Sequence, residues 1–277
     1  MTADLSRLAS LPGVGEAIDE AREACTRLRW HEALRRRVPE VAAESRVRGA
    51  RASAFLEGAE VPVDLVRDAM RGAVALDDGP GDRVLTGAIR ATAETEHLGG
   101  VLRTAPAQAI ATLHKAAAAA VMAPDALARP RQGDETPSDL AELGAAPPPA
   151  EAAQRLRGVV ELIASLGEAP GILLTAIVHA EVATARPFGY ANALVARALE
   201  RALLQASGVD PVGGVVSEAG HARQGAVAYQ GALSAYLTGS TEGVGLWLRH
   251  CAQAVVAGAA EATEIADAVL AGRLTGH

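Results

Sequence analysis

The sequence has 277 residues, and its 26 basic and 33 acidic residues give a net charge of −7. This balance argues against a broad nucleic-acid surface, and two cysteines provide neither a disulfide framework nor the spacing of a metal site. The longest apolar runs, such as GILLTAIV and AAAAAVMA, fall far short of the roughly 20 residues that cross a bilayer. The start, MTADLSRLAS, lacks the pattern of a signal peptide. We therefore expect a cytoplasmic protein that binds neither nucleic acid nor a membrane.

Apolar residues recur at helical spacing along most of the chain, whereas alternating strand patterns are scarce. The periodicity predicts helices over 14–28, 39–57, 62–71, 82–98, 105–122, 151–166, 170–184, 192–207, 217–236 and 241–271. Residues 29–37 contain a run of three arginines, which is typical of a solvated helical face. The predicted fold class is all-α, with N-terminal helices in 1–38 and one helical domain over 39–271.

The segment 123–150 breaks this pattern, because it is rich in Pro, Gly and Asp and has no helical period. A loop of this length in a compact domain is usually functional or disordered, and the sequence leaves both open. Helical segments flank it on both sides, so we interpret it as an insert within one domain. It is the segment where we expect a protein partner to bind.

One loop between two predicted helices combines features of an anion site. It begins at Arg186, and Asn192 stands where its side chain could cap the following helix. The first backbone amides of that helix, including the amide of Ala193, would point out of the loop. Arg197 lies about one turn further along. These groups could together hold a phosphate, although many helix starts with a nearby arginine bind nothing.

Residues 186–197, RPFGYANALVAR, resemble the motif His-Pro-Phe-x-Asp/Glu-Gly-Asn-Gly-Arg-x-x-Arg of the Fic (filamentation induced by cyclic AMP) family. The Pro, Phe, Asn and last Arg of the motif match. Residues 53–58, SAFLEG, fit the inhibitory pattern Ser/Thr-x-x-x-Glu-Gly/Asn of that family, and the insert falls where its members carry a flap that aligns target chains. The resemblance implies a Fic-like helical domain with an inhibitory-type helix over 39–58 and a flap-like insert over 123–150.

The unmatched positions remove the chemistry that the resemblance would otherwise imply. In the family, the motif His is the general base when AMP is transferred from ATP to a protein hydroxyl. Arg186 stands there, and a guanidinium cannot be deprotonated. The family's acid holds Mg²⁺, but Tyr190 stands there, and a neutral phenol is a poor ligand for that cation. Ala191 and Ala193 replace glycines and would be strained at positive φ, while Leu194 removes a cation. We therefore expect no catalytic residue, no metal ligand and no Mg²⁺.

Both halves of the family's inhibitory contact remain. In the family, the Glu of the inhibitory helix, whose motif begins here at Ser53, pairs with the last Arg of the main motif. Glu57 and Arg197 are therefore expected to form an ion pair; the alternative is that Glu57 ends its helix and Arg197 is solvated. Arg186 adds a cation, so Arg186, Arg197 and the helix start are expected to form a positive pocket for ATP or another phosphate-bearing ligand. Tyr190 would stack on Arg186 or fill the metal position.

The histidines near these segments are not expected to bind a metal. His179, in the helix before the motif, is expected to pack in the core, and His221 is expected at the surface. His250 and Cys251 are adjacent on a helix and so point in different directions.

Three functions therefore remain open. The first is a catalytically degenerate regulator or interaction module, which suits Arg186 and Tyr190. The second is a nucleotide-dependent transferase with altered chemistry that does not transfer AMP, which requires another general base. The third is a dimerising helical domain, which would expose an apolar helical face for a homodimer.

Overall fold

The computed structural model describes residues 2–274, and the chain is all-α over that range, as the sequence predicts. Its helices are α1 (Thr2–Ala9), α2 (Val14–Arg29), α3 (Val38–Leu56), α4 (Val63–Met70), α5 (Pro80–Glu94), α6 (Gly99–Thr104), α7 (Pro106–Ala118), α8 (Pro149–Ala164), α9 (Gly171–Ala185), α10 (Asn192–Ala206), α11 (Ser217–Gln224), α12 (Ala226–Leu237) and α13 (Thr241–Leu270). Short 3-10 turns are η1 (Glu32–Arg35), η2 (Thr95–His97), η3 (Pro124–Ala126) and η4 (Ala141–Leu143). Within residues 2–274, no helix combines the length and the apolar character that a membrane span requires.

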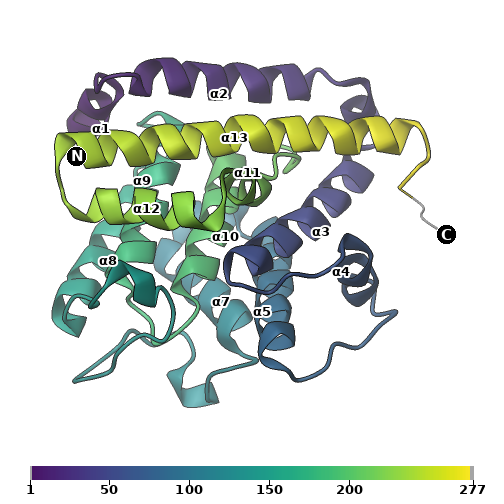
Figure 1. The fold of residues 1–277 in the computed structure, drawn as a ribbon. Helices are drawn as coiled ribbons and strands as arrows, with labels where there is room; N and C mark the ends of the chain where they lie inside the picture. Colours follow the sequence, from purple (N-terminus) through teal and green to yellow (C-terminus); the bar gives the residue numbers. More distant parts are fainter. Residues whose placement is uncertain (1, 275–277) are drawn as a thin grey trace.

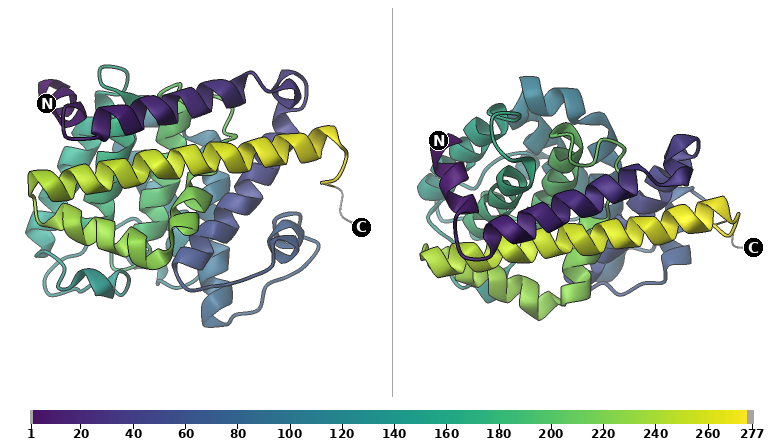
Figure 2. Two further views of the ribbon diagram at one scale, coloured as in Figure 1. Left: turned by 45° about the horizontal axis from the view of Figure 1, so that its top comes forward. Right: turned by 90° about the horizontal axis from the view of Figure 1, so that it is seen from above.

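The long helix α13 and the N-terminal helix α2 lie side by side across one face of the molecule (Figures 1 and 2). On its other side α13 packs against α11 and α12, and α9 and α10 form an adjacent pair beneath them. Ile18 and Leu28 of α2 belong to the same hydrophobic core as the apolar residues of α9 and α10. The N-terminal helices are thus packed on the central ones.

Composition explains why α9 and α10 lie at the centre. Apolar residues surround α9 on all sides, which is typical of a helix enclosed by others. In α10 every residue from Asn192 to Leu204 is buried, including the charged residues Arg197, Glu200 and Arg201. Because burying an unpaired charge is costly, each of these side chains must find a partner inside the protein.

Close contacts between helices depend on glycine at particular crossings. A Cβ atom at Gly220 in α11 would lie 1.9 Å from the carbonyl oxygen of Ala254 in α13. At Gly87 in α5 it would lie 2.3 Å from the carbonyl oxygen of Ala117 in α7. No side chain fits at either position unless a backbone moves.

The structure corrects several predicted boundaries. Gly225, at φ 95°, divides the helix predicted over 217–236 into α11 and α12. The helix predicted over 105–122 ends at Ala118, and the separate helix α6 precedes it. Residues 29–37 form only the turn η1 instead of a helical face. Finally, α1 was not predicted.

The insert runs over the loop between α9 and α10 along a defined path. The amide of Arg131 donates to the carbonyl of Pro187 at 2.8 Å, and the amide of Ser138 donates to the carbonyl of Gly189 at 2.9 Å. These two main-chain hydrogen bonds fix the middle of the insert against the motif residues. The insert therefore contributes side chains directly to the candidate site.

Candidate functional site

The buried cation of the site is Arg197, which is fully enclosed on α10. Its Nη2 donates to Oε1 of Glu57 at 2.8 Å, so the structure contains the expected ion pair. Nε and Nη2 also donate to the hydroxyl and carbonyl oxygens of Ser53, at 2.8 and 3.2 Å. Burial works to lower the pKa of Arg197, but the Glu57 carboxylate and the Tyr229 hydroxyl more than compensate, and the net shift is upward. Arg197 therefore has no unpaired charge to offer a ligand.

A carboxylate from the insert occupies the start of α10. Oδ2 of Asp139 accepts from the backbone amide of Ala193 at 3.2 Å, and Oδ1 accepts from Nδ2 of Asn192 at 2.8 Å. The amide of Ala193 is one of those that were expected to face a phosphate, because a helix N-terminus favours an anion. Burial, together with repulsion from Glu57, raises the pKa of Asp139 to about 6. Sequence reasoning missed Asp139, since no motif marks an acid in the insert that contacts a residue 53 positions later.

The motif loop itself has a strained backbone that its side chains hold in place. Arg186 and Ala191 both adopt positive φ, at 45° and 66°, a conformation that costs about 1–3 kcal/mol for a residue other than glycine. The strain expected at Ala191 is thus present, whereas Ala193 lies in the regular first turn of α10. The expected N-cap role of Asn192 is wrong: its Oδ1 accepts from the amide of Phe188 and its Nδ2 donates to the carbonyl of the same residue. Asn192 therefore closes the loop.

Arg186 turns away from Arg197. Its side chain is 2% exposed, and its Nη1 donates to the carbonyl of Leu140 at 3.0 Å. It lines a hollow under the insert, formed with Arg131 and residues 133–137, 141 and 144–149, which we call the insert hollow. The expected positive pocket of Arg186 and Arg197 is therefore wrong, because Arg186 lines the insert hollow, whereas Arg197 is fully buried and is not part of that lining.

The space beside Arg197 is a separate pocket of 420 Å³, which we call the motif pocket. Its lining includes Phe55, Glu57, Asp139, Glu142, Tyr190 and Tyr229. The charged groups in this lining are carboxylates, so the pocket is acidic. Tyr190 lines it without an aromatic contact to Arg186 among the described residues, and burial raises its pKa to about 12. The phenol is therefore neutral near pH 7.

A chain of buried polar side chains leads from the motif pocket into the core. The hydroxyl of Tyr229 lies 2.8 Å from Nε2 of His179, whose Nδ1 lies 2.5 Å from Oε2 of Glu200. Oε2 also lies 2.9 Å from Nε2 of His221, whose Nδ1 lies 3.0 Å from Nε2 of His250. With ionised Glu200 as the common acceptor, both neighbouring rings donate to it. His179 packs in the core as expected, but His221 is fully buried, so its expected surface position is wrong.

The pKa values of His179, His250 and Glu200 agree with two neutral rings and an ionised acid. Burial lowers the pKa of His179 to about 4 and that of His250 to about 3. Burial alone would raise the pKa of Glu200, but the adjacent imidazoles lower it below its usual value. His179, Glu200 and His221 also offer three ligand atoms within 4.8 Å of one another, a donor set that suits zinc or iron. Hydrogen bonds already join these atoms, and a metal would have to break them.

His114 links three parts of the site and was not singled out from the sequence. Its Nε2 donates to the carbonyl of Tyr190 at 3.2 Å, and its Nδ1 accepts from the amide of Ala128 at 2.8 Å. The ring stacks on Phe188 with centroids 3.9 Å apart. Burial lowers its pKa to about 4. A neutral His114 therefore ties α7 to the motif loop and to the start of the insert.

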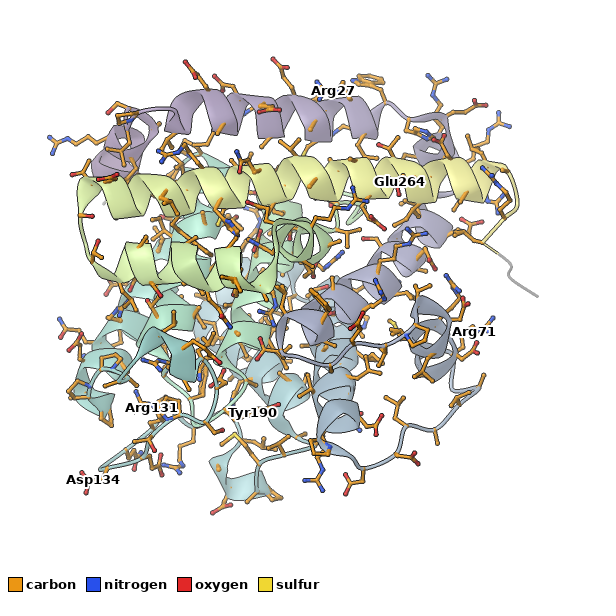
Figure 3. All side chains as sticks on the ribbon, in the orientation of Figure 1. Arg27, Arg71, Arg131, Asp134, Tyr190 and Glu264 are labelled. Atoms are coloured by element: carbon orange, nitrogen blue, oxygen red, sulfur yellow. The ribbon has the colours of Figure 1, made fainter. Side chains whose placement is uncertain are left out.

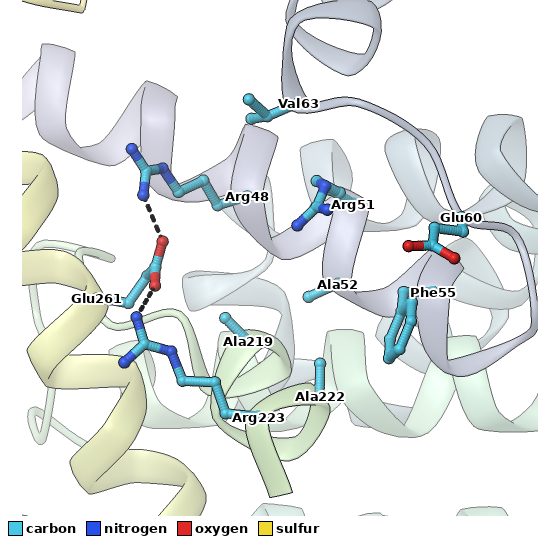
Figure 4. A pocket seen from close by; sticks show the side chains of 10 residues that line it. All are labelled: Arg48, Arg51, Ala52, Phe55, Glu60, Val63, Ala219, Ala222, Arg223 and Glu261. Carbon is cyan, nitrogen blue, oxygen red and sulfur yellow. Dashed lines mark hydrogen bonds and ion pairs between the residues drawn. The ribbon is translucent and has the colours of Figure 1, made fainter. Parts of the chain in front are cut away.

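A further hollow, of 520 Å³, lies between α3, α11 and α13. Figure 4 shows that the carboxylate of Glu261 lies between the guanidiniums of Arg48 and Arg223 and binds both. Arg48 and Arg223 are thus paired, whereas Arg51, which also lines the hollow, donates to the carbonyl of Val61. The residues brought together by the motif lie elsewhere, around Arg197.

Comparisons with known proteins agree with the fold described above. No family model and no curated protein sequence matches the chain. Similar solved structures include a Fic family protein from Desulfovibrio desulfuricans G20 (TM-score 0.66, 15% identity, 91% of this chain and 74% of that one) and Fic-1 (aa134–508) from C. elegans (0.67, 15%, 94% and 73%). A Fic domain containing signaling protein from Bacteroides thetaiotaomicron is also similar (0.63, 13%, 91% and 98%). The resemblance read from the motif is thus confirmed in three dimensions: this chain has the Fic fold.

Proposed function

We propose that this chain is a catalytically degenerate protein of the Fic fold that acts as a regulator or interaction module. The observation that carries the proposal is that the chain fills both positions at which the resemblance would place phosphates. Asp139 accepts from the amide of Ala193 and the side chain of Asn192 at the start of α10, and Glu57 neutralises Arg197. Nucleotide would have to displace two carboxylates of the protein itself.

The groups needed for AMP transfer are also replaced. Arg186, at the position of the family's base, cannot accept a proton and faces the insert hollow. Loss of a general base costs roughly 10²–10⁴-fold in rate. Tyr190, at the position of the family's metal-binding acid, stays neutral and is a poor ligand for Mg²⁺. His179 is sealed in the core and makes its contacts within the buried network.

One observation favours the second candidate function, a transferase with altered chemistry. The pKa of Asp139, raised to about 6, lies in the range of an effective general base. Both oxygens of this carboxylate, however, already accept hydrogen bonds from Asn192 and Ala193. Catalysis through Asp139 would require the insert to move first.

The same geometry suggests how a partner would act on the module. Asp139 belongs to the insert, so a protein that binds residues 123–150 and moves them would withdraw this carboxylate from α10. We therefore place the partner at the insert and leave the homodimer as the alternative assembly. ATP or another phosphate-bearing ligand would bind only in the displaced state.

Calorimetric titration of ATP, with and without Mg²⁺, tests the proposal on wild type, Glu57→Gly, Asp139→Ala and the double variant. We expect no binding by wild type and binding by the double variant that is at least ~10-fold tighter than by either single variant. Glu142→Gln is the matched control, because it removes a charge from the same pocket but no contact to α10 or Arg197. Binding and turnover of ATP by wild type, lost in Asp139→Ala, would overturn the proposal in favour of the transferase.

A further inference from the structure

Two buried guanidiniums lie next to each other under the insert. Arg131 is 4% exposed, and its Nε donates to the carbonyl of Arg186 at 2.7 Å. Its Nη1 and Nη2 donate to the carbonyls of Glu135 and Pro147, at 2.7 and 2.9 Å. Arg131 thus donates these hydrogen bonds to backbone oxygens, and they hold the insert in its shape. Figure 3 shows it at the base of the molecule, on the same side as Asp134.

Arg186 is less well satisfied. Its Nη1 reaches the carbonyl of Leu140, but among the described residues its Nε has no hydrogen-bond partner, although it is buried. An unsatisfied buried donor on a charged group is costly, and native proteins rarely leave one without a reason. The donor belongs to a side chain that lines the insert hollow, a space of 550 Å³.

Neither guanidinium has a carboxylate in ion-pair contact within residues 2–274. Two acids of the insert, Asp134 and Glu135, also line the hollow. Glu135 is engaged by Arg129 and by the amide of Gln132, and Asp139 is held at the start of α10. Burial lowers the pKa of Arg186; the charge of Asp139 raises it, the charge of Arg131 lowers it, and the net shift is downward. Two buried positive charges without a direct counter-ion favour an anion between them.

We propose that the insert hollow binds the phosphate group of a small molecule, with the guanidinium of Arg186 as its donor. A planar guanidinium matches the spacing of phosphate oxygens, and a dianion compensates two cations better than a carboxylate does. The site is distinct from the motif pocket, which is acidic. It therefore goes beyond the proposed function and does not depend on whether the motif pocket binds a nucleotide.

The test follows the Nε–H resonance of Arg186 by NMR in the ¹⁵N-labelled full chain at about pH 8, where phosphate is mostly a dianion. Inorganic phosphate, O-phosphoserine, acetate and chloride are titrated at constant ionic strength. We expect a saturable shift with inorganic phosphate, at least ~10-fold weaker binding of acetate, and no saturable shift with chloride. Comparison of inorganic phosphate with O-phosphoserine shows whether the hollow prefers a free phosphate or a phosphate ester.

Variants link the shift to the hollow. We expect Arg186→Gln to weaken phosphate binding at least ~10-fold, and Arg186→Lys, which keeps the charge but loses the planar donor, to weaken it less. Arg83→Gln is the matched control, because it removes a cation that is paired with Asp78, and neither of these two residues lines the hollow. No saturable shift in wild type, an equal response to chloride, or unchanged phosphate binding in Arg186→Gln would each overturn the proposal. The wild-type titrations decide the matter even if a variant fails to fold.

Discussion

We expect protonation of His114 to lower the stability of the folded protein in mild acid. The folded state needs the neutral ring, because Nδ1 accepts from the amide of Ala128 while Nε2 donates to Tyr190. A proton on Nδ1 would place the N–H group of the ring directly opposite the N–H group of Ala128, so this hydrogen bond would be lost. The pKa of His114 falls from 6.5 to about 4 in the fold, so between these values the unfolded chain binds the proton and the folded chain does not. The free energy of unfolding must then decrease as the pH falls from 6.5 towards 4.

The shift corresponds to about 3 kcal/mol over the full interval, and to about 2 kcal/mol between pH 7.5 and pH 5. Other groups also contribute: His179 and His250 act in the same direction, whereas Asp139, with its raised pKa, acts in the opposite one. The variant His114→Gln isolates the effect, since an amide keeps a donor and an acceptor but does not titrate.

Urea unfolding of both proteins at pH 7.5 and pH 5 measures the difference. We expect the loss of stability on acidification to be about 2 kcal/mol smaller in His114→Gln than in wild type. Equal losses in the two proteins would refute the reasoning, as would an imidazole of His114 that titrates near pH 6.5 by NMR.

Three further predictions concern packing and buried charge. Gly220→Ala places a Cβ 1.9 Å from a backbone oxygen of α13 and should lower the free energy of unfolding by about 1–3 kcal/mol or more. The control Gly231→Ala, with no atom within 4 Å of its Cβ, should be neutral or stabilising by up to about 1 kcal/mol. Similar melting temperatures for the two variants would contradict the packing. Arg201→Met should cost about 3–5 kcal/mol in urea unfolding, because it leaves Glu218, 1% exposed and bound twice at 2.8 Å, without its cation; a cost below about 1 kcal/mol would show that the pair is hydrated. Burial raises the pKa of the Cys25 thiol to about 12 and that of the Cys251 thiol well above its usual value. Neither thiol should therefore react with a disulfide reagent until the chain is unfolded. Rapid labelling of the folded protein would show that the thiols are not buried.

The long helices could be predicted from the sequence because their apolar periodicity is continuous and their ends are marked. The predicted segments 39–57, 192–207 and 241–271 lie within a residue of α3, α10 and α13 at each end. The break at Gly225 was missed because apolar residues continue on both sides of a single glycine, which helices often tolerate. The helix α1 was missed because a short segment gains most of its stability from tertiary packing.

The candidate site was predictable only where a motif fixes the spacing. The contact between Glu57 and Arg197 was implied by the resemblance to the Fic family, because its two motifs match at both residues. Asp139 reaches the site through the path of the insert, and His114 reaches it through the packing of α7 against the motif loop; no local pattern encodes either. The side of the loop on which Arg186 lies depends on its positive φ, and that conformation could not be read from the residue type.

Because Asp139 is attached to the chain, it competes for the start of α10 at an effective concentration rather than at a bulk one. Even a short flexible tether gives values in the millimolar range, and here two main-chain hydrogen bonds, from Arg131 to Pro187 and from Ser138 to Gly189, hold the tether in place. A free anion at micromolar concentration would need an affinity for this helix start roughly 1,000-fold higher than that of Asp139 to compete equally. A molecule that lifts the insert removes the competitor, so occupancy of this helix start would be controlled by contacts to the insert and not by the abundance of the anion.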